Sequence, residues 1–146
     1  MTTKTKIPST TKSLPIALLR ARERVMGPIR GMLADAGVTE QQWRVLRVLD
    51  EEGPMDPTSI AERAVLLLPS LTRILHKLEG KGLITRKRDT TDRRRQIITA
   101  TASGSEIIAA NMATSRDILK KLREQLGEER HDVLIDLLVE LTELDD

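Results

Sequence analysis

The segment from Ser70 to Arg95 constrains the fold most, because its periodicity changes from helical to extended within a few residues. Its first part spaces apolar residues at i, i+3, i+4 and i+7, which places them on one face of a helix: Leu71, Ile74, Leu75 and Leu78. Gly80 and Gly82 end that helix, and two runs rich in Ile and Thr follow, at 83–88 and 94–99, around a polar turn at 89–92. The pattern predicts a helix that packs by one stripe and leads into an antiparallel hairpin.

The same segment is strongly cationic. Only Glu79, Asp89 and Asp92 oppose its basic residues, which are Arg73, Lys77, Lys81, Arg86, Lys87, Arg88, Arg93, Arg94 and Arg95. The whole chain has a formal net charge of only +2, and acids predominate from Glu124 onward. A polar helix and a basic hairpin on one surface suit a polyanion, and double-stranded DNA is the obvious one.

The remaining pattern is helical. Runs at 14–34, 40–51, 57–64, 102–125 and 128–144 have helical spacing; Thr39, Asp56 and Thr101 stand where N-caps are expected, and Gly27–Pro28 is expected to kink the first run. The join at 65–68 is unusually apolar, so we expect it to pack inward. The predicted class is mainly α with a small antiparallel β-hairpin wing, in one compact domain: a flexible arm at 1–12, a winged helix-turn-helix at 37–101, and helical dimerisation segments at 13–36 and 102–146.

Several function classes find no support in the sequence. Cysteine is absent, and His76 and His131 stand far apart without an acidic cluster, so we expect no metal, no cofactor and no enzyme activity. Trp43 is the only aromatic residue, which argues against modules that stack single-stranded bases. No apolar run approaches the about 20 residues of a membrane span, and the N-terminal residues lack a signal core, so a cytoplasmic protein without membrane contact is expected.

The predicted geometry assigns roles to individual residues. The second helix of a helix-turn-helix enters the major groove, so its polar face is predicted to meet bases or phosphates: Ser70, Thr72, Arg73, His76 and Lys77. The hairpin reaches the neighbouring minor groove, where one of Arg93, Arg94 and Arg95 inserts. Lys87 and Arg88 are predicted to touch the DNA backbone. At least one wing arginine is expected to be structural, paired with an aspartate such as Asp92.

The chain resembles the multiple-antibiotic-resistance regulator (MarR) family of ligand-responsive bacterial repressors. The resemblance rests on Ser70-Leu71-Thr72-Arg73, Leu78-Glu79-Gly80-Lys81-Gly82-Leu83-Ile84, Asp92-Arg93-Arg94 and Thr101-x-x-Gly104. Ala100 stands where the family pattern has leucine. Arg22-Glu23, Gln41-Gln42-Trp43-Arg44-Val45-Leu46-Arg47 and Leu68-Pro69-Ser70-Leu71-Thr72 resemble the branch that represses homoprotocatechuate (4-hydroxyphenylacetate) degradation operons.

The resemblance implies a homodimer that binds a palindromic operator and is released by a small molecule, often an aromatic acid. Trp43 lies among Val and Leu in its helix, so it is either a core residue or a wall of an effector pocket. Arg22 is a candidate for holding an effector carboxylate. The alternatives are a winged-helix protein-interaction module without DNA binding, and a basic surface that is merely solvated.

Overall fold

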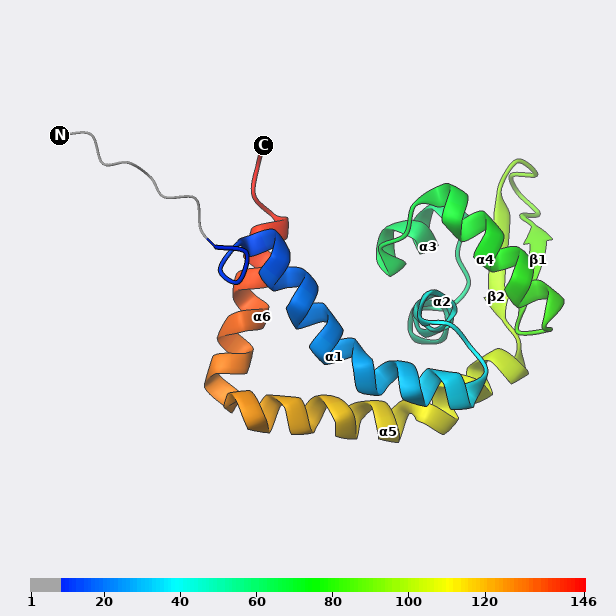
Figure 1. Ribbon diagram of the computed structural model, residues 1–146. Helices are drawn as coiled ribbons and strands as arrows, with labels where there is room; N and C mark the ends of the chain where they lie inside the picture. The colour runs from blue at the N-terminus through cyan, green and yellow to red at the C-terminus, as the bar shows by residue number, and fades with distance from the viewer. Residues whose placement is uncertain (1–8) are drawn as a thin grey trace. The chain divides into compact units, whose positions relative to one another are not determined.

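The computed structural model describes residues 9–146, so most of the predicted N-terminal arm lies outside the described residues. Six helices and one hairpin follow in the order that Figure 1 shows: α1 (Leu14–Ala36), α2 (Glu40–Glu52), α3 (Pro57–Ala64), α4 (Leu68–Gly80), β1 (Ile84–Arg88), β2 (Gln96–Ala100), α5 (Ala102–Leu126) and α6 (Glu128–Thr142). The predicted class, mainly α with a β-hairpin wing, is confirmed.

Local capping fixes where three helices begin. Thr39 starts α2 with a reciprocal capping box, in which its hydroxyl accepts from the third residue of the helix. The Asp56 carboxylate accepts from the backbone N–H of Ser59 at 2.9 Å, and Pro57 follows it at the first helical position. Thr101 does the same for α5, accepting from Gly104 N–H at 3.2 Å. All three N-caps are therefore confirmed.

Residues 30–115 form one compact unit, which we call the winged unit. The predicted stripe of α4 is buried in its core together with residues of α2, α3, the hairpin and α5, among them Val45, Leu46, Ile60, Leu71, Leu75, Leu78, Ile84, Ile98 and Ile108. The strands pair antiparallel from Ile84 opposite Ala100 to Arg88 opposite Gln96. Figure 1 shows α4 alongside this hairpin, so the helix and the wing belong to one packed body.

Gly104 is required by a close approach inside this unit. A Cβ at this position would collide with the backbone carbonyl oxygen of Leu83 and press against the side chain of Leu46. The backbone N–H of Thr101 also donates to Leu83 O at 3.0 Å, so the chain entering α5 is held against the start of the hairpin. The glycine therefore lets α5 begin directly beside β1.

The turn of the hairpin is wider than predicted, and the second strand begins two residues later. Asp89 N–H donates to Arg95 O at 2.8 Å, and Arg95 N–H donates to Asp92 O at 3.0 Å. The Asp92 carboxylate also accepts from the backbone N–H of Arg94 at 3.1 Å. These turn bonds compete with strand pairing, so Arg94 and Arg95 lie in the turn, where the prediction placed the start of a strand.

The prediction that the join at 65–68 packs inward is wrong. Val65 is 79% exposed, Leu67 77% and Leu68 46%. Val65 ends α3 in the left-handed conformation, at φ 56°, which turns the chain away from the core. Ala61 and Ala64 before the join and Leu71 after it already fill the buried positions.

The second compact unit contains residues 9–29 and 116–146 of the described chain. Its helix α6 has no buried residue, although it is rich in leucine and valine. The exposed large apolar residues of this segment are Val133, Leu134, Ile135, Leu137, Leu138, Val139, Leu141 and Leu144. Within residues 9–146, every helix is too short or too polar to cross a membrane.

Candidate nucleic-acid interface

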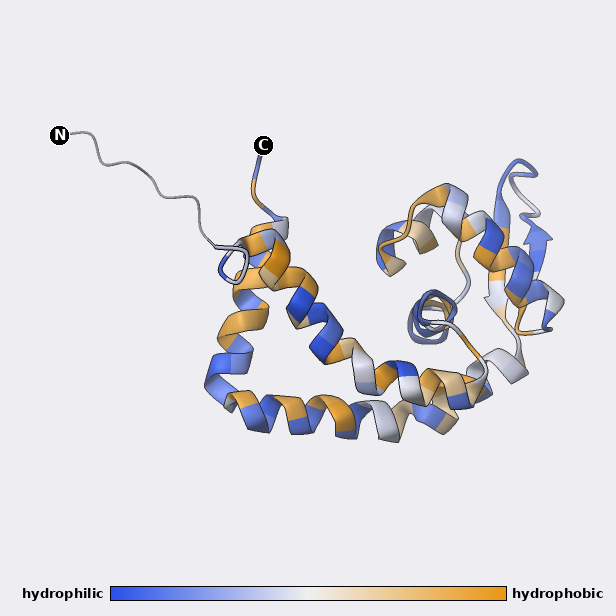
Figure 2. Ribbon diagram, in the orientation of Figure 1, coloured by the Kyte–Doolittle hydropathy of each residue, from blue (hydrophilic) through white to orange (hydrophobic). Residues whose placement is uncertain are grey.

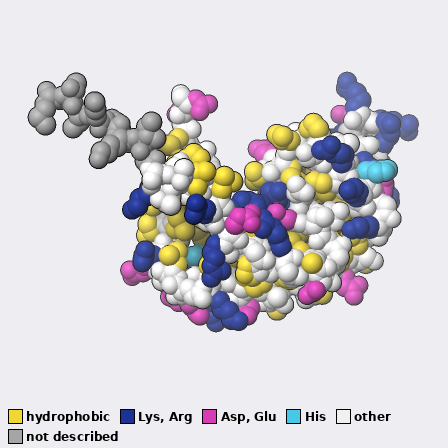
Figure 3. Space-filling view, in the orientation of Figure 1, with side chains coloured by type: hydrophobic (Ala, Val, Ile, Leu, Met, Phe, Trp, Pro, Cys, Tyr) yellow, Lys and Arg dark blue, Asp and Glu magenta, His cyan; other side chains and the backbone are white. Residues whose placement is uncertain are grey.

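The polar face of α4 is open to solvent. Thr72, Arg73, His76 and Lys77 are exposed, and Ser70 is half-buried near the start of the helix. The four exposed side chains line one hollow together with Arg86 from β1. Figure 3 shows Lys and Arg side chains gathered over this side of the winged unit and at the hairpin tip. The five predicted α4 residues therefore lie on one helix, beside the wing.

Two basic residues of the same segment hold the unit together. The Arg86 guanidinium donates to the Glu79 carboxylate at 3.0 Å, which ties β1 to the end of α4. The Lys81 ammonium donates to Gly37 O at 3.1 Å and to the amide oxygen of Gln42 at 3.2 Å, which ties the end of α4 to the start of α2. Both side chains fix the direction of α4 relative to its neighbours.

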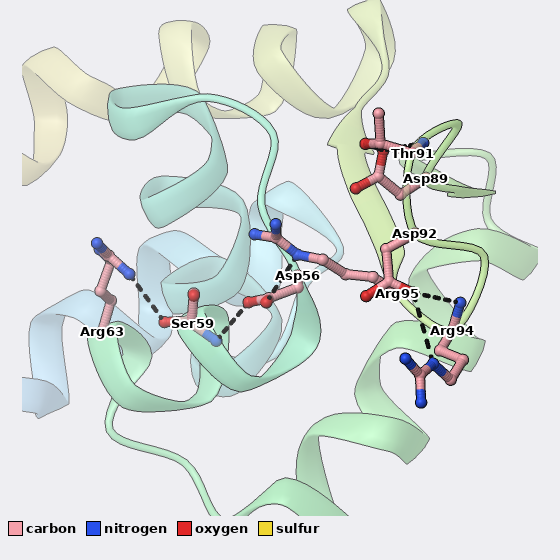
Figure 4. Close-up of polar contacts among 8 residues, drawn as sticks. All are labelled: Asp56, Ser59, Arg63, Asp89, Thr91, Asp92, Arg94 and Arg95. Carbon is pink, nitrogen blue, oxygen red and sulfur yellow. Dashed lines mark hydrogen bonds and ion pairs between the residues drawn. The ribbon is translucent and has the colours of Figure 1, made fainter.

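One wing arginine is anchored. Figure 4 shows Arg95 reaching from the turn to Asp56 at the start of α3, where its Nε donates to the carboxylate at 3.1 Å. The pKa of Asp56 is lowered, first by its hydrogen bonds with Ser59 and then by the charge of Arg95. The carboxylate therefore stays ionised while it caps α3 and holds the wing. The Arg95 side chain is still 50% exposed.

The other wing arginines are more open. Arg94 is 96% exposed, and its Nε lies 3.7 Å from the Asp92 carboxylate, so the predicted Asp92 pair is present but loose. Arg88 donates to the backbone oxygen of Arg93 at 3.0 Å, which braces the turn. The Arg93 and Lys87 side chains are exposed and have no ion pair or hydrogen bond with another side chain of residues 9–146.

A second hollow runs between α4 and the wing. It is lined by Thr72 and Leu68 of α4, by Asp56 at the start of α3, and by the wing residues Arg88, Arg93, Arg94, Arg95 and Gln96. Four guanidinium groups against one carboxylate give this hollow a positive potential, which suits phosphate oxygens. Asp56, predicted only as an N-cap, and Leu68 were missed as members of this surface.

The two predicted effector residues lie in different units. Trp43 of α2 is 8% exposed and belongs to the core, and it also lines a hollow with Arg44, Arg47 and Arg63. The Nε of Arg44 is buried without a hydrogen-bond partner in the described chain. Arg22 is an exposed residue of α1. Arg44 and Arg47 were missed as lining residues, although Arg47 lies one helical turn after Trp43 and Arg44 follows it directly.

Comparison with known proteins identifies this arrangement. The MarR family profile matches residues 38–95, which run from the start of α2 to the wing. The homoprotocatechuate degradative operon repressor of Escherichia coli is 36% identical over 132 residues, covering 90% of this chain and 89% of the repressor. The chain belongs to the MarR family.

Two solved MarR-like structures extend the similarity. NadR in complex with 4-hydroxyphenylacetate is 36% identical with a TM-score of 0.79, and the match covers 99% of this chain and 100% of NadR. The transcriptional repressor CouR bound to a 23-mer DNA duplex is 30% identical with a TM-score of 0.77, and the match covers 96% of this chain and 99% of CouR. The winged helix-turn-helix fold of this MarR regulator is therefore confirmed, as is the resemblance to the homoprotocatechuate branch.

Proposed function

We propose that this protein is a sequence-specific, double-stranded DNA-binding repressor of an aromatic-acid catabolic operon, active as a homodimer and released by a small aromatic carboxylate. The observation that carries the proposal is the juxtaposition of an exposed polar α4 face with a cationic wing in one packed unit. The similarity to CouR, solved on a DNA duplex, and to the E. coli operon repressor supports it. Such a regulator acts in the cytoplasm and needs no catalytic step.

The residues divide by role. Ser70, Thr72, Arg73, His76 and Lys77 of α4 meet base edges and phosphates in the major groove, because the N-terminal residues of a recognition helix lie nearest the bases. In the wing, Lys87 and Arg88 contact backbone phosphates, while Arg93 or Arg94 enters the minor groove. Arg95 is the structural arginine, since its guanidinium is held by the Asp56 carboxylate at 3.1 Å.

DNA binding is tested by fluorescence anisotropy against genomic fragments at two salt concentrations. We expect tight binding to one fragment and weaker, steeply salt-dependent binding to the rest. Arg73→Ala should lower the preference for the operator by about 1–3 kcal/mol, the usual value of a base contact. Lys121→Ala is the matched control, because Lys121 is an exposed cation of the other compact unit. Binding to no fragment at low salt would instead favour the protein-interaction module.

The proposed dimer follows from the small number of base pairs that one recognition helix can contact. One recognition helix reads only a few base pairs, whereas a two-fold dimer places two helices about 34 Å apart on a palindrome. The exposed leucine-rich surface of α6 supplies apolar area that a monomer leaves in water. We therefore place the subunit contact on α6 and the exposed N-terminal leucines of α1, Leu14 and Leu18.

The effector proposal rests on chemistry at two positions. The indole of Trp43 is the only aromatic wall the chain can offer, and guanidinium groups line the hollow beside it. An aromatic carboxylate needs both an apolar wall and a planar cation. NadR was solved with 4-hydroxyphenylacetate, which supports this ligand class. Arg22 is the second candidate for the carboxylate and is tested separately.

Effector binding can be followed without labels, since Trp43 is the single tryptophan. Titration with 4-hydroxyphenylacetate should change its fluorescence and should dissociate a preformed operator complex over the same concentration range. Phenylethanol-type analogues without the carboxylate are the matched control and should do neither. Arg22→Gln and Arg47→Gln should each be titrated, and the variant whose apparent affinity falls identifies the carboxylate contact.

A further inference from the structure

The start of α4 carries an exposed apolar cluster that no packing role explains. Leu67 and Leu68 lie next to each other, 77% and 46% exposed, and Figure 2 shows the hydrophobic chain leading into the helix. Single exposed leucines are ordinary, but adjacent ones on a surface otherwise rich in cations are not. The core of the winged unit is complete without them, since Leu71 is the first buried residue of the helix.

The same residues break two local rules. Leu67 occupies the N-cap position of α4 and makes no side-chain hydrogen bond, whereas Thr39, Asp56 and Thr101 cap their helices. Replacing a polar cap by an aliphatic residue destabilises the start of a helix. Val65 adds a β-branched residue in the left-handed region. Departures from local preference that packing does not offset mark functional positions.

Leu68 is continuous with the cationic surface. It lines the same hollow as Thr72 and the wing arginines 93–95, while Val65 lines the separate hollow near Trp43. Thr72 Oγ1 donates to Leu68 O at 3.1 Å, so its hydrogen is used inside the helix. What Thr72 retains for a partner is a methyl group and the two acceptor lone pairs of its hydroxyl. The first turn of α4 thus offers mainly apolar contacts at the point nearest the bases.

We propose that Leu67 and Leu68 contact thymine C5-methyl groups in the major groove, which makes them specificity-determining residues. The inference rests on the proposed DNA-binding function and adds the kind of contact by which α4 distinguishes one base from another. Thymine is the only base that presents a methyl group in the major groove, and apolar side chains are the groups that recognise it. The cations attract any duplex, whereas these leucines favour half-sites with thymine where the N-terminus of α4 enters.

The test removes the methyl group and nothing else. Once the operator is known, each of its thymines is replaced by deoxyuridine at symmetric positions of both half-sites, and affinity is measured by anisotropy. We expect one or two positions at which wild-type affinity falls about fourfold per methyl, the value of burying one such group. The same deoxyuridine positions should have no effect on the double variant Leu67→Ala/Leu68→Ala, which already lacks the contact.

Leu119→Ala is the matched control, because it shortens an exposed leucine of the other compact unit, away from the hollow that Leu68 lines. It should keep the full deoxyuridine response. Thermal unfolding of all variants checks that each folds. A wild-type protein that binds its operator equally well with and without the methyl groups overturns this inference alone. A double variant that keeps the deoxyuridine response also overturns it, while absence of any DNA binding overturns the proposed function as well.

Discussion

The anchoring of Arg95 by Asp56 makes a prediction about which wing charges face DNA. Substituting Arg93→Gln removes one exposed cation that has no side-chain partner in the described chain. The double variant Asp56→Asn/Arg95→Gln removes a cation and its partner together, so the net charge is unchanged. Asparagine caps a helix about as well as aspartate, so α3 should keep its start. The pair is half exposed, so its loss should cost at most about 1 kcal/mol of stability.

The magnitude follows from counterion release. Each phosphate contact contributes about 0.9 to the slope of log affinity against log salt, so a homodimer that loses Arg93 twice loses about 1.8. Raising salt from about 50 to about 200 mM should then shrink the ratio of wild-type to Arg93→Gln affinity about 12-fold. The Asp56→Asn/Arg95→Gln variant should keep the wild-type slope, because Arg95 stays on Asp56 and contacts no phosphate.

The assay is operator anisotropy at four or more salt concentrations, with thermal unfolding of each variant alongside. Equal loss of slope in the two variants would refute the reasoning, since it would mean that Arg95 leaves Asp56 to bind DNA. An unchanged slope in Arg93→Gln would show that this exposed wing cation is not a phosphate contact. Arg94→Gln tests the other exposed wing arginine in the same way. Its 3.7 Å pair with Asp92 is too loose to neutralise the charge of Arg94.

Three further outcomes are expected. Gly104→Ala should destabilise the protein by about 1–3 kcal/mol in urea, because its Cβ meets backbone that cannot move; Gly80→Ala, with open space around it, should be neutral or slightly stabilising. Leu137→Asp, on the exposed face of α6, should give a monomer by size-exclusion chromatography, and a dimer that persists would move the subunit contact elsewhere. Hydrogen bonds from Arg123, and then from His131, hold the pKa of Asp132 far below its ordinary value. The ionised Asp132 carboxylate therefore stabilises the folded protein above about pH 3.9, and this contribution to the free energy of unfolding is lost as pH falls further. Asp132→Asn should be less stable than wild type at neutral pH and should approach the wild-type stability in acid, as thermal unfolding at several pH values will show.

The sequence predicted those features of the fold that depend on residues close together in the chain, such as helix faces and helix caps. The stripe through Leu71 and Leu78 is set by helical spacing, and the caps at Thr39 and Asp56 are set by bonds to residues three positions away. The wing anchor was not predictable in the same way, because Asp56 and Arg95 are 39 positions apart and either could have paired with a nearer charge. Asp92, the nearer aspartate, makes only the longer contact.

The error at 65–68 has a similar cause. Composition reports that a segment is apolar, but not whether the core has room for it, and here the alanines of α3 and the stripe of α4 already fill the core. The second strand was predicted to start at Arg94 because the strand pattern extends to that residue. In the structure, hydrogen bonds to the Asp92 carboxylate and carbonyl hold Arg94 and Arg95 in the turn. Tertiary competition for these backbone groups is not visible in a propensity pattern.

The two kinds of exposed side chain in the winged unit have different consequences for recognition. Arginines at the wing give an attraction that every duplex shares and that salt weakens. The leucines at the start of α4 are uncharged, so salt does not screen their contacts. They contribute binding free energy only where a methyl group meets them and water is excluded, so their contribution depends on the DNA sequence. Their exposure weakens the free protein slightly, through an uncapped helix and unburied apolar area. The apolar area is removed from water only on a matching site, so the first turn of α4 provides discrimination and the wing provides the general affinity.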